Sequence, residues 1–286
     1  MPIEFDKLMA LEIPDRKQSY TARDSMLYAL GLGAGLDPLD QDELPFVYEA
    51  EQKALPTMAV VLAHPGFWVR DLETGIDWMR VVHGEQSLRI HQPLPVEGDV
   101  LGRNRIVDVV DKGEGRGALV KSERQIIDTK TDTLLATILQ TTFCRSDGGF
   151  GGSARPKTIP HPIPDRVPDV SVETPTSTQG ALIYRLSGDY NPLHADPVVA
   201  KNAGFDRPIL HGLATYGVAG RAILQGLCDH DPTRLDAIEC RFTAPVFPGE
   251  TFRTDCWRDG NEVSFRVTAI ERDVVAINNG RAVLNG

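Results

Sequence analysis

The sequence is short of the features that mark several large classes of protein. Its 286 residues contain only four cysteines, with no C-x-x-C pair and no zinc-like spacing: Cys144, Cys228, Cys240 and Cys256. We therefore expect buried, reduced thiols and no disulfide framework. No apolar run approaches the length of a membrane span, and the acidic N-terminus lacks the apolar core of a signal peptide. These absences predict a cytoplasmic protein that does not enter a membrane.

Positive charge is also scarce. The 30 Lys and Arg residues are outnumbered by 40 Asp and Glu residues, which gives a formal net charge of −10. Phosphate contacts along a nucleic acid need clustered Lys and Arg, so a general nucleic-acid-binding surface is not expected. A local basic patch for one phosphorylated ligand stays open. The remaining composition is that of an ordinary globular protein, and the length is sufficient for two domains.

A segment rich in glycine and proline divides the chain nearly in the middle. Residues 144–176 hold four glycines and six prolines and show no hydrophobic period, so they cannot form one regular element. The pattern predicts an N-terminal domain over 1–146, a linker over 147–172 and a C-terminal domain over 173–286.

The two halves resemble each other weakly. Arg89 and Pro93 match Arg241 and Pro245 at an offset of 152 residues, and Pro56 matches Pro208 at the same offset. In each half, three runs of alternating apolar residues follow, which predicts strands with one buried face. Turns such as "KGEGRG" and "RDGN" favour hairpins between these strands.

The run "HGLATYGVAGRAILQGL", residues 211–227, is apolar on almost every side. A helix with this pattern must be buried on almost every side. The economical arrangement is an antiparallel sheet curled around one central helix. We therefore predict an α+β fold in which each half is a helix wrapped by a sheet, and the two halves pair as a pseudo-dimer.

The stretch "SGDYNPLHAD" gathers a carboxylate, an amide and an imidazole on one loop. Pro192 directs Asn191 away from the helical conformation, so the loop presents side chains instead of continuing an element. Asp189 and His194 can then hold one water between them. An isolated Asp-x-Asn loop is usually a turn that stabilises itself, but the continuation to His194, and then to "LHGL" ahead of the buried helix, favours catalysis.

"YRLSGDYNPLHAD" followed by "GFDRPILHGLATYG" resembles the signature of the hydratase 2 family, the MaoC-like (R)-specific 2-enoyl-CoA hydratases. "YTARDSMLYALGLG", "HPGF" and "HGEQSLRIHQPLP" resemble the N-terminal half of the eukaryotic-type members. The resemblance implies a double hot-dog fold with a degenerate first half, and a homodimer. It implies hydration of trans-2-enoyl-CoA to (3R)-hydroxyacyl-CoA in fatty-acid or steroid side-chain β-oxidation. Coenzyme A would be part of the substrate, and no metal or redox cofactor would be required.

The resemblance also implies roles for single residues. Asp189 would activate the attacking water, while His194 would position that water and share the acid–base work. Asn191 would help to fix substrate or water, and the backbone amide of Gly212 would hold the charge that develops on the thioester oxygen. Four further residues are expected to contact the substrate: Gly188, Phe205, His211 and Leu213. His211 is also expected to order the loop or to cap its helix.

Several features have a structural interpretation. The spacing of Asp189, His194, Asp196 and His211 matches no known metal-ligand pattern. Asp196 is better placed to cap the next helix, with Pro197 at its first position. His64, His83 and His91 lack the partner pattern of the loop, so we expect them to be structural.

The first half has a possible purpose of its own. "YALGLGAGLDPLD" follows a short helix start, which predicts a truncated first-half helix that would leave room for a bulky acyl chain. The nearest alternative activity is a 3-hydroxyacyl-thioester dehydratase acting on a coenzyme A or acyl-carrier-protein substrate. The alternative from another class is a non-catalytic acyl-CoA-binding subunit.

Overall fold

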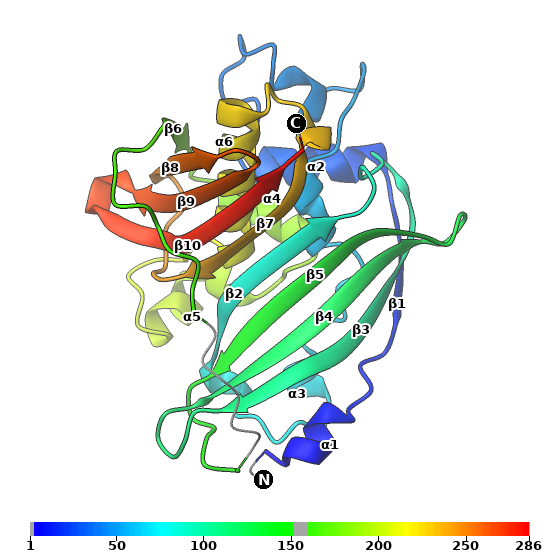
Figure 1. Cartoon of the computed structure of the whole chain (residues 1–286), viewed down its shortest axis with the longest axis vertical. Coiled ribbons are helices and arrows are strands. Elements are labelled where there is room, and N and C mark those ends of the chain that lie inside the picture. The colour runs from blue at the N-terminus through cyan, green and yellow to red at the C-terminus, as the bar shows by residue number, and fades with distance from the viewer. Residues whose placement is uncertain (1–2, 152–158, 286) are drawn as a thin grey trace.

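The computed structural model describes residues 3–151 and 159–285, so residues 152–158 of the predicted linker lie outside the described residues. The described strands form one ten-stranded sheet in the order β1-β3-β4-β5-β2-β7-β10-β9-β8-β6 (Figure 1). Every neighbouring pair is antiparallel. The first-half strands are β1 (Arg16–Tyr20), β2 (Val81–Ile90), β3 (Gly98–Asp111), β4 (Ala118–Asp128) and β5 (Thr133–Cys144). The second-half strands are β6 (Val170–Pro175), β7 (Leu235–Phe242), β8 (Thr251–Asp259), β9 (Glu262–Ala269) and β10 (Val274–Leu284).

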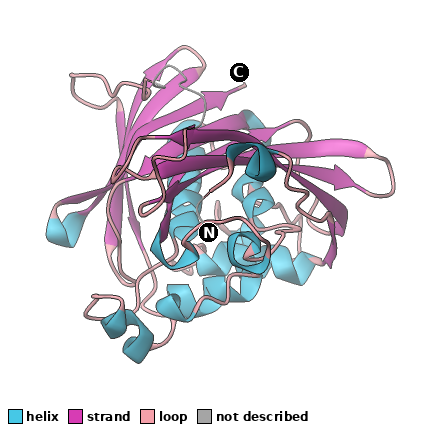
Figure 2. Cartoon of the chain, turned by 90° about the horizontal axis from the view of Figure 1, so that it is seen from below, coloured by secondary structure: helices cyan, strands magenta, loops and turns pink. Residues whose placement is uncertain are grey.

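Most helices lie together on one side of this sheet, inside its curve (Figure 2). The α-helices are α1 (Phe5–Met9), α2 (Ala22–Gly31), α3 (Trp68–Asp71), α4 (Gly180–Tyr184), α5 (Pro197–Asn202) and α6 (Gly212–Leu227). The 3-10 turns are η1 (Leu44–Phe46), η2 (Pro56–Val60), η3 (Trp78–Arg80), η4 (Arg185–Ser187), η5 (Pro192–His194), η6 (Pro232–Arg234) and η7 (Ile270–Arg272). Among the described residues, no helix has both the length and the apolar character needed to cross a bilayer.

The strand predictions are confirmed in both halves, but β6 begins at Val170, inside the segment that was predicted to be a linker without regular structure. The three alternating runs of the first half form β3, β4 and β5, and those of the second half form β8, β9 and β10. The "KGEGRG" and "RDGN" turns connect antiparallel neighbours, β3 with β4 and β8 with β9. Alternation of apolar residues is local information, which explains why sequence alone located these strands.

The two half-sheets join through β2 and β7, side by side at the centre of Figure 1. Glu85 pairs with Arg241 and Arg89 pairs with Ala237. Under the repeat offset of 152 residues, these two pairs are equivalent to each other, and the Ser87–Glu239 pair lies between them. The register therefore places a pseudo-twofold axis at Ser87 and Glu239, as a pseudo-dimer requires.

Helix α6 is the buried helix that the sequence predicts. Eleven of its sixteen residues are buried, and its glycines permit close packing against the first half. A Cβ atom on Gly220 would lie 2.6 Å from the methyl group of Thr57, and a Cβ on Gly217 would lie 2.7 Å from Leu32. Helix α6 is therefore held by the first half as well as by its own sheet.

The first half has no comparable helix among its described residues. The truncated helix was predicted at "YALGLGAGLDPLD", and that position is wrong. Tyr28–Gly31, the start of "YALGLGAGLDPLD", ends the ten-residue α2, which packs against α4. The repeat offset matches Gly212, the first residue of α6, with Val60, the last residue of η2. Three residues later Ala63 has a positive φ of 45°, which a helix cannot continue through. By this offset residues 60–75 are equivalent to α6, and in place of one long helix they hold the last residue of η2, the turn at Ala63 and the four-residue α3.

Candidate active site

The loop between α4 and α5 carries Asp189 and His194, the predicted catalytic pair. Gly188 ends η4 with a φ of 123°, a conformation that favours glycine. Asp189 follows at once and keeps access to solvent, whereas His194, at the end of η5, is buried. Backbone shape therefore sends the carboxylate outward and the imidazole inward toward the start of α6.

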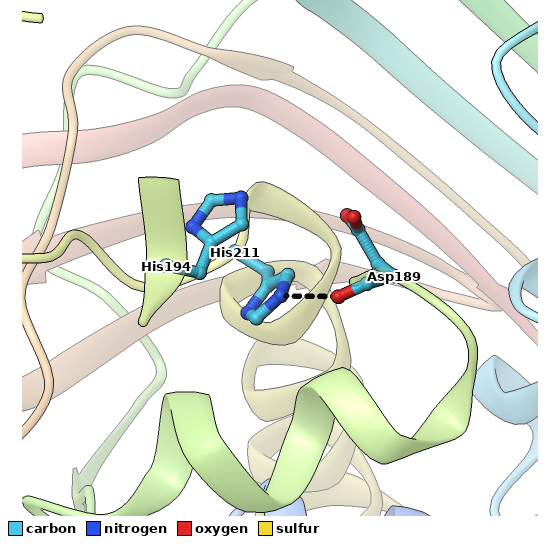
Figure 3. A group of neighbouring side chains, drawn as sticks. All are labelled: Asp189, His194 and His211. Carbon is cyan, nitrogen blue, oxygen red and sulfur yellow. Dashed lines mark hydrogen bonds between the residues drawn. The ribbon is translucent and has the colours of Figure 1, made fainter. Parts of the chain in front are cut away.

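Asp189, His194 and His211 come together at the N-terminal end of α6 (Figure 3). One nitrogen of each ring and one carboxylate oxygen of Asp189 all lie within 4.8 Å of one another. A water that forms two hydrogen bonds of about 2.8 Å can bridge acceptors at this separation. The geometry therefore suits a water held between Asp189 and His194, as the sequence predicted.

The tautomer of His194 follows from its surroundings. Its Nδ1 lies 2.9 Å from the backbone carbonyl oxygen of Ile209, and since a carbonyl can only accept, Nδ1 carries the proton. Burial lowers the pKa of His194, although the Ile209 carbonyl and the Asp189 charge act in the opposite direction. The ring is therefore neutral at neutral pH, with the lone pair of Nε2 available as a proton acceptor.

His211 supports this arrangement. Its ring stacks on His194 with centroids 3.7 Å apart, and its Nε2 donates to the Asp189 carbonyl oxygen at 3.2 Å. Burial and the neighbouring His194 lower the pKa of His211 to about 4. His211 thus orders the loop, as expected. It occupies the N-cap position of α6 without a side-chain capping bond, so only its place, and not its side chain, caps the helix.

Gly212 supplies a free backbone donor beside these groups. It is the first residue of α6, and no acceptor in the described part of the chain bonds its amide. A free N–H at a helix N-terminus carries partial positive charge. The ring of Phe242 lies 3.6 Å from where a Gly212 Cβ would be, which gives this donor one apolar wall. The amide is suited to an oxyanion, and that role stays a prediction.

Asn191 and Asp196 shape the loop. The Asn191 side-chain oxygen accepts from the Leu193 amide at 3.0 Å, so at least this oxygen serves the turn. Its predicted contact with substrate or water is untested. Asp196 accepts from the amides of Val198 and Val199 at the start of α5, with Pro197 at the first helical position. The prediction that Asp196 is an N-cap is confirmed.

The other predicted substrate contacts are less tightly placed. Leu213 is half-buried and packs on the edge of the main core. Phe205 is half-buried in the loop after α5, where its amide donates to the Ala200 carbonyl. The space around the Cα of Gly188 is open, so a turn alone accounts for this glycine. Substrate binding by these three residues remains a prediction.

Sequence reasoning missed a contribution from the first half. His83 on β2 packs edge-on against Phe242, with ring centroids 4.8 Å apart. Burial lowers its pKa to about 4, and Asp189 is close enough for its charge to oppose that shift. His83 therefore lies beside the site and is more than a remote structural residue. The only signal was its place in "HGEQ", because no local pattern shows that β2 lies against β7.

Two family models divide the chain between them. The MaoC like domain matches residues 161–280, and the MFE-2 hydratase 2 N-terminal domain matches residues 18–146. Over 286 aligned residues the chain is 38% identical to the enoyl-CoA hydratase ChsH3 of Mycobacterium tuberculosis, covering 98% of each chain. The chain belongs to the MaoC-like hydratase 2 family. Its similarity to family members extends through both halves, including the half without the long helix.

Three further proteins are similar to this chain in sequence or in structure. The 3-hydroxyacyl-thioester dehydratase Y of Mycobacterium tuberculosis is 43% identical over 84% of this chain and 82% of its own. The crystal structure of a MaoC-like dehydratase from Phytophthora capsici superposes with a TM-score of 0.88 at 33% identity, over 99% and 98% of the two chains. A double hot-dog protein of Mycobacterium tuberculosis superposes with a TM-score of 0.57 at 16% identity, over 99% of each chain. The predicted double hot-dog fold is thereby confirmed.

Proposed function

We propose that the protein is an (R)-specific 2-enoyl-CoA hydratase, which adds water reversibly to trans-2-enoyl-CoA and yields (3R)-hydroxyacyl-CoA. The observation that carries this proposal is the convergence of the Asp189 carboxylate, the free Nε2 of His194 and the free Gly212 amide at the start of α6. The similarity of nearly the whole chain to named enoyl-CoA hydratases supports it. Fatty-acid or steroid side-chain β-oxidation is the proposed context.

The mechanism follows from these three groups. A water donates one hydrogen bond to Asp189 and one to His194 Nε2, so its oxygen lone pair faces the β-carbon of the substrate. As the C–O bond forms, the electrons of the double bond move toward the thioester oxygen, where the Gly212 amide stabilises the charge. Asp189 takes one proton of the attacking water and then delivers a proton to the α-carbon, which regenerates the carboxylate and completes the addition of water. General acid–base groups of this kind contribute roughly 10²–10⁴-fold each.

The reverse reaction deserves separate measurement. The strong similarity to a 3-hydroxyacyl-thioester dehydratase fits the same groups acting in the direction of water loss. Comparing kcat/KM for coenzyme A and acyl-carrier-protein thioesters of one acyl group, in both directions, identifies the carrier and the favoured direction.

The test is the loss of enoyl-thioester absorbance when purified protein meets crotonyl-CoA, and then longer and branched trans-2-enoyl-CoAs. Chiral analysis identifies the product, and His194→Gln serves as the matched variant because glutamine can still donate to the Ile209 carbonyl. We expect (3R) product from the natural protein and a loss of at least about 100-fold in the variant. Tight binding without turnover on any chain would instead identify an acyl-CoA-binding subunit, and a (3S) product would contradict the proposed stereochemistry.

Three further expectations belong to this proposal. Activity should survive treatment with a chelator, because the mechanism uses no metal or redox cofactor. Light scattering should find a homodimer. The cytoplasmic location is likewise a proposal, checked by fractionation of the source cells.

A further inference from the structure

The inner face of the first-half sheet contains an arginine at a position whose neighbours on the adjacent strands are apolar. Arg124 on β4 pairs with Ile138 on β5, and Ile138 pairs with Leu88 on β2. Directly opposed residues of neighbouring strands share one face of a sheet. Ile138 and Leu88 are 3% and 0% exposed, and Arg124 is itself only 7% exposed. Arg124 therefore points into the interior with the core residues.

Arg124 also lacks the partner that a buried cation needs. In the described part of the chain, no carboxylate lies within ion-pair distance of it; one guanidinium NH2 group donates to the Val60 carbonyl, and the buried Nε has no hydrogen-bond acceptor. Burial lowers the pKa of Arg124 to about 10, still far above neutral pH, so the side chain remains charged. A buried, charged donor without an acceptor is costly.

The chain shows what a structural buried arginine looks like. Arg221 on α6 is as buried as Arg124, at 6% exposure, but its Nε lies 2.5 Å from a carboxylate oxygen of Glu43. A second donor of Arg221 reaches the Leu32 carbonyl at 2.6 Å. Arg221 is thus fully accounted for by the fold. Arg124, unlike Arg221, therefore has a donor that an acceptor from outside the chain can use.

The space beside Arg124 is polar and open to a ligand atom. A hollow of about 20 Å³ adjoins the arginine, with His64, Asn104, Ser122 and Gln140 among the residues around it. This volume accepts one water or one oxygen atom of a ligand. The one carboxylate on its border, Glu123, is already paired with Arg105 at 2.7 Å. The hollow therefore offers donors around a single uncompensated positive charge.

A series of neighbouring groups connects this hollow to the active site. Phe242 lies against Gly212, and His83 packs on Phe242. His64 lies near enough to both His83 and Arg124 for their charges to contribute to its lowered pKa of about 3. Burial is the main cause of that shift, yet the His64 side chain keeps access to solvent, as a group at the mouth of a hollow would. An acyl group that runs from the thioester carbonyl along these residues would extend toward Arg124.

We propose that Arg124 binds an oxygen-bearing anionic group, a carboxylate, at the far part of the acyl chain, so that the preferred substrates are trans-2-enoyl-CoA thioesters with a distal carboxylate. This inference rests on the proposed hydratase function. A carboxylate would accept from the unpaired Nε and compensate the buried charge, with Gln140 and Ser122 beside it as further donors. Arg124 acts in this proposal as a specificity determinant and not as a catalytic residue.

The test compares two trans-2-enoyl-CoA series of matched chain lengths, one with an unsubstituted end and one with an ω-carboxylate. The proteins are the natural chain, Arg124→Met and Arg124→Lys. We expect the natural protein to prefer the carboxylated member by roughly 10–100-fold in kcat/KM at one chain length, since charge-assisted hydrogen bonds are the strong ones. Arg124→Met should lose this preference through KM while its kcat on crotonyl-CoA is unchanged, and Arg124→Lys should retain part of the preference.

Each outcome separates this inference from the proposed function. If no thioester is hydrated, the hydratase function itself is wrong. If crotonyl-CoA is hydrated but the natural protein shows no preference for ω-carboxylates at any length, the Arg124 proposal is wrong, whether or not the variants fold. If Arg124→Met lowers kcat/KM for both series equally, the arginine is structural and the proposal is likewise overturned.

Discussion

The two halves share one sheet design and differ in what lies on it. Each half contributes five of the described strands, and their order runs symmetrically outward from the β2–β7 pair. The second half adds the sixteen-residue α6 and the loop with Asp189 and His194, whereas the equivalent residues 60–75 of the first half hold a turn at Ala63 and the four-residue α3. The sheet thus maintains the fold in both halves, and the helix with its preceding loop carries the proposed active site in one.

The absence of a long helix in the first half also affects how α6 of the second half is packed. Helix α6 needs partners on nearly every side, and the first half supplies several, including Thr57 of η2 and Leu32. A second long helix that began at Val60 would run through the segment that now contains His64, and the Val60 carbonyl now accepts from Arg124. Under the proposal for Arg124, loss of the helix exchanges a second active site for a binding surface.

The largest expected effect comes from substituting Asp189. The repeat offset matches Asp189 with Asp37, an exposed residue whose carboxylate accepts from the Leu39 amide in its own turn. Asp189→Asn should lower kcat on crotonyl-CoA by roughly 10²–10⁴-fold, and Asp37→Asn should leave it within about twofold. Equal effects of the two substitutions would mean that the halves do not differ in chemistry.

The next effect isolates one backbone amide. Gly212→Pro removes the N–H at the first helical position, where proline is well tolerated. The preceding residue, His211, already has the extended backbone that proline requires (φ −62°, ψ 138°). We expect a loss of about 10²–10³-fold in kcat with little change in melting temperature. Gly212→Ala keeps the amide, and its Cβ would meet Phe242 at an ordinary 3.6 Å, so most activity should remain. A proline variant as active as the alanine variant would remove the oxyanion role from this amide.

A third prediction concerns the contact between the halves. Gly220→Ala would place a methyl group 2.6 Å from the Thr57 methyl, and overpacking of this kind costs about 1–3 kcal/mol. Urea denaturation should show that loss in the free energy of unfolding. Adding Thr57→Ser removes the opposing methyl group and should restore most of it. Additive losses in the double variant would show that the two residues do not limit each other.

The pH dependence of kcat/KM should reflect His194. Its pKa is lowered by burial, and the mechanism needs the neutral ring. Activity is therefore retained as the pH falls through about 6.5, the ordinary histidine value, and is lost only at a lower pH. Circular dichroism over the same range separates titration from unfolding. An acidic limb above pH 6.5 in a folded protein would contradict this assignment.

The smallest effect tests the pseudo-twofold axis. Glu85 and Arg241 form an ion pair at 2.6 Å, but at the equivalent position Arg89 faces Ala237. Ala237→Glu would create the symmetric pair and should raise the free energy of unfolding by about 0.3 kcal/mol at low salt, as exposed pairs do. Ala237→Gln is the uncharged control. A gain that persists in high salt, or equals that of the control, would not come from the ion pair.

Local patterns in the sequence predicted much of this molecule. Alternating residues located the strands, the all-round apolar run located α6, and Asp189 and His194 lie within one loop, so their proximity needed no tertiary information. The position at which the first-half helix is shortened was predicted wrongly. The turn at Ala63 depends on a positive φ, and nothing about an alanine in the sequence indicates one. His83 and Arg124 were missed as site candidates for another reason: their surroundings depend on pairing between distant strands.

The axis at Ser87 and Glu239 has a consequence for how such a molecule can vary. In a dimer of two identical chains, any substitution appears twice, so a change that shortens the central helix removes both helices and both active sites. Here the two equivalent positions are different residues of one chain and are encoded separately. One half can lose its helix, gain a buried arginine and change its substrate while the other keeps its catalytic loop intact. Covalent fusion of the halves thus removes the constraint that symmetry imposes on a homodimer.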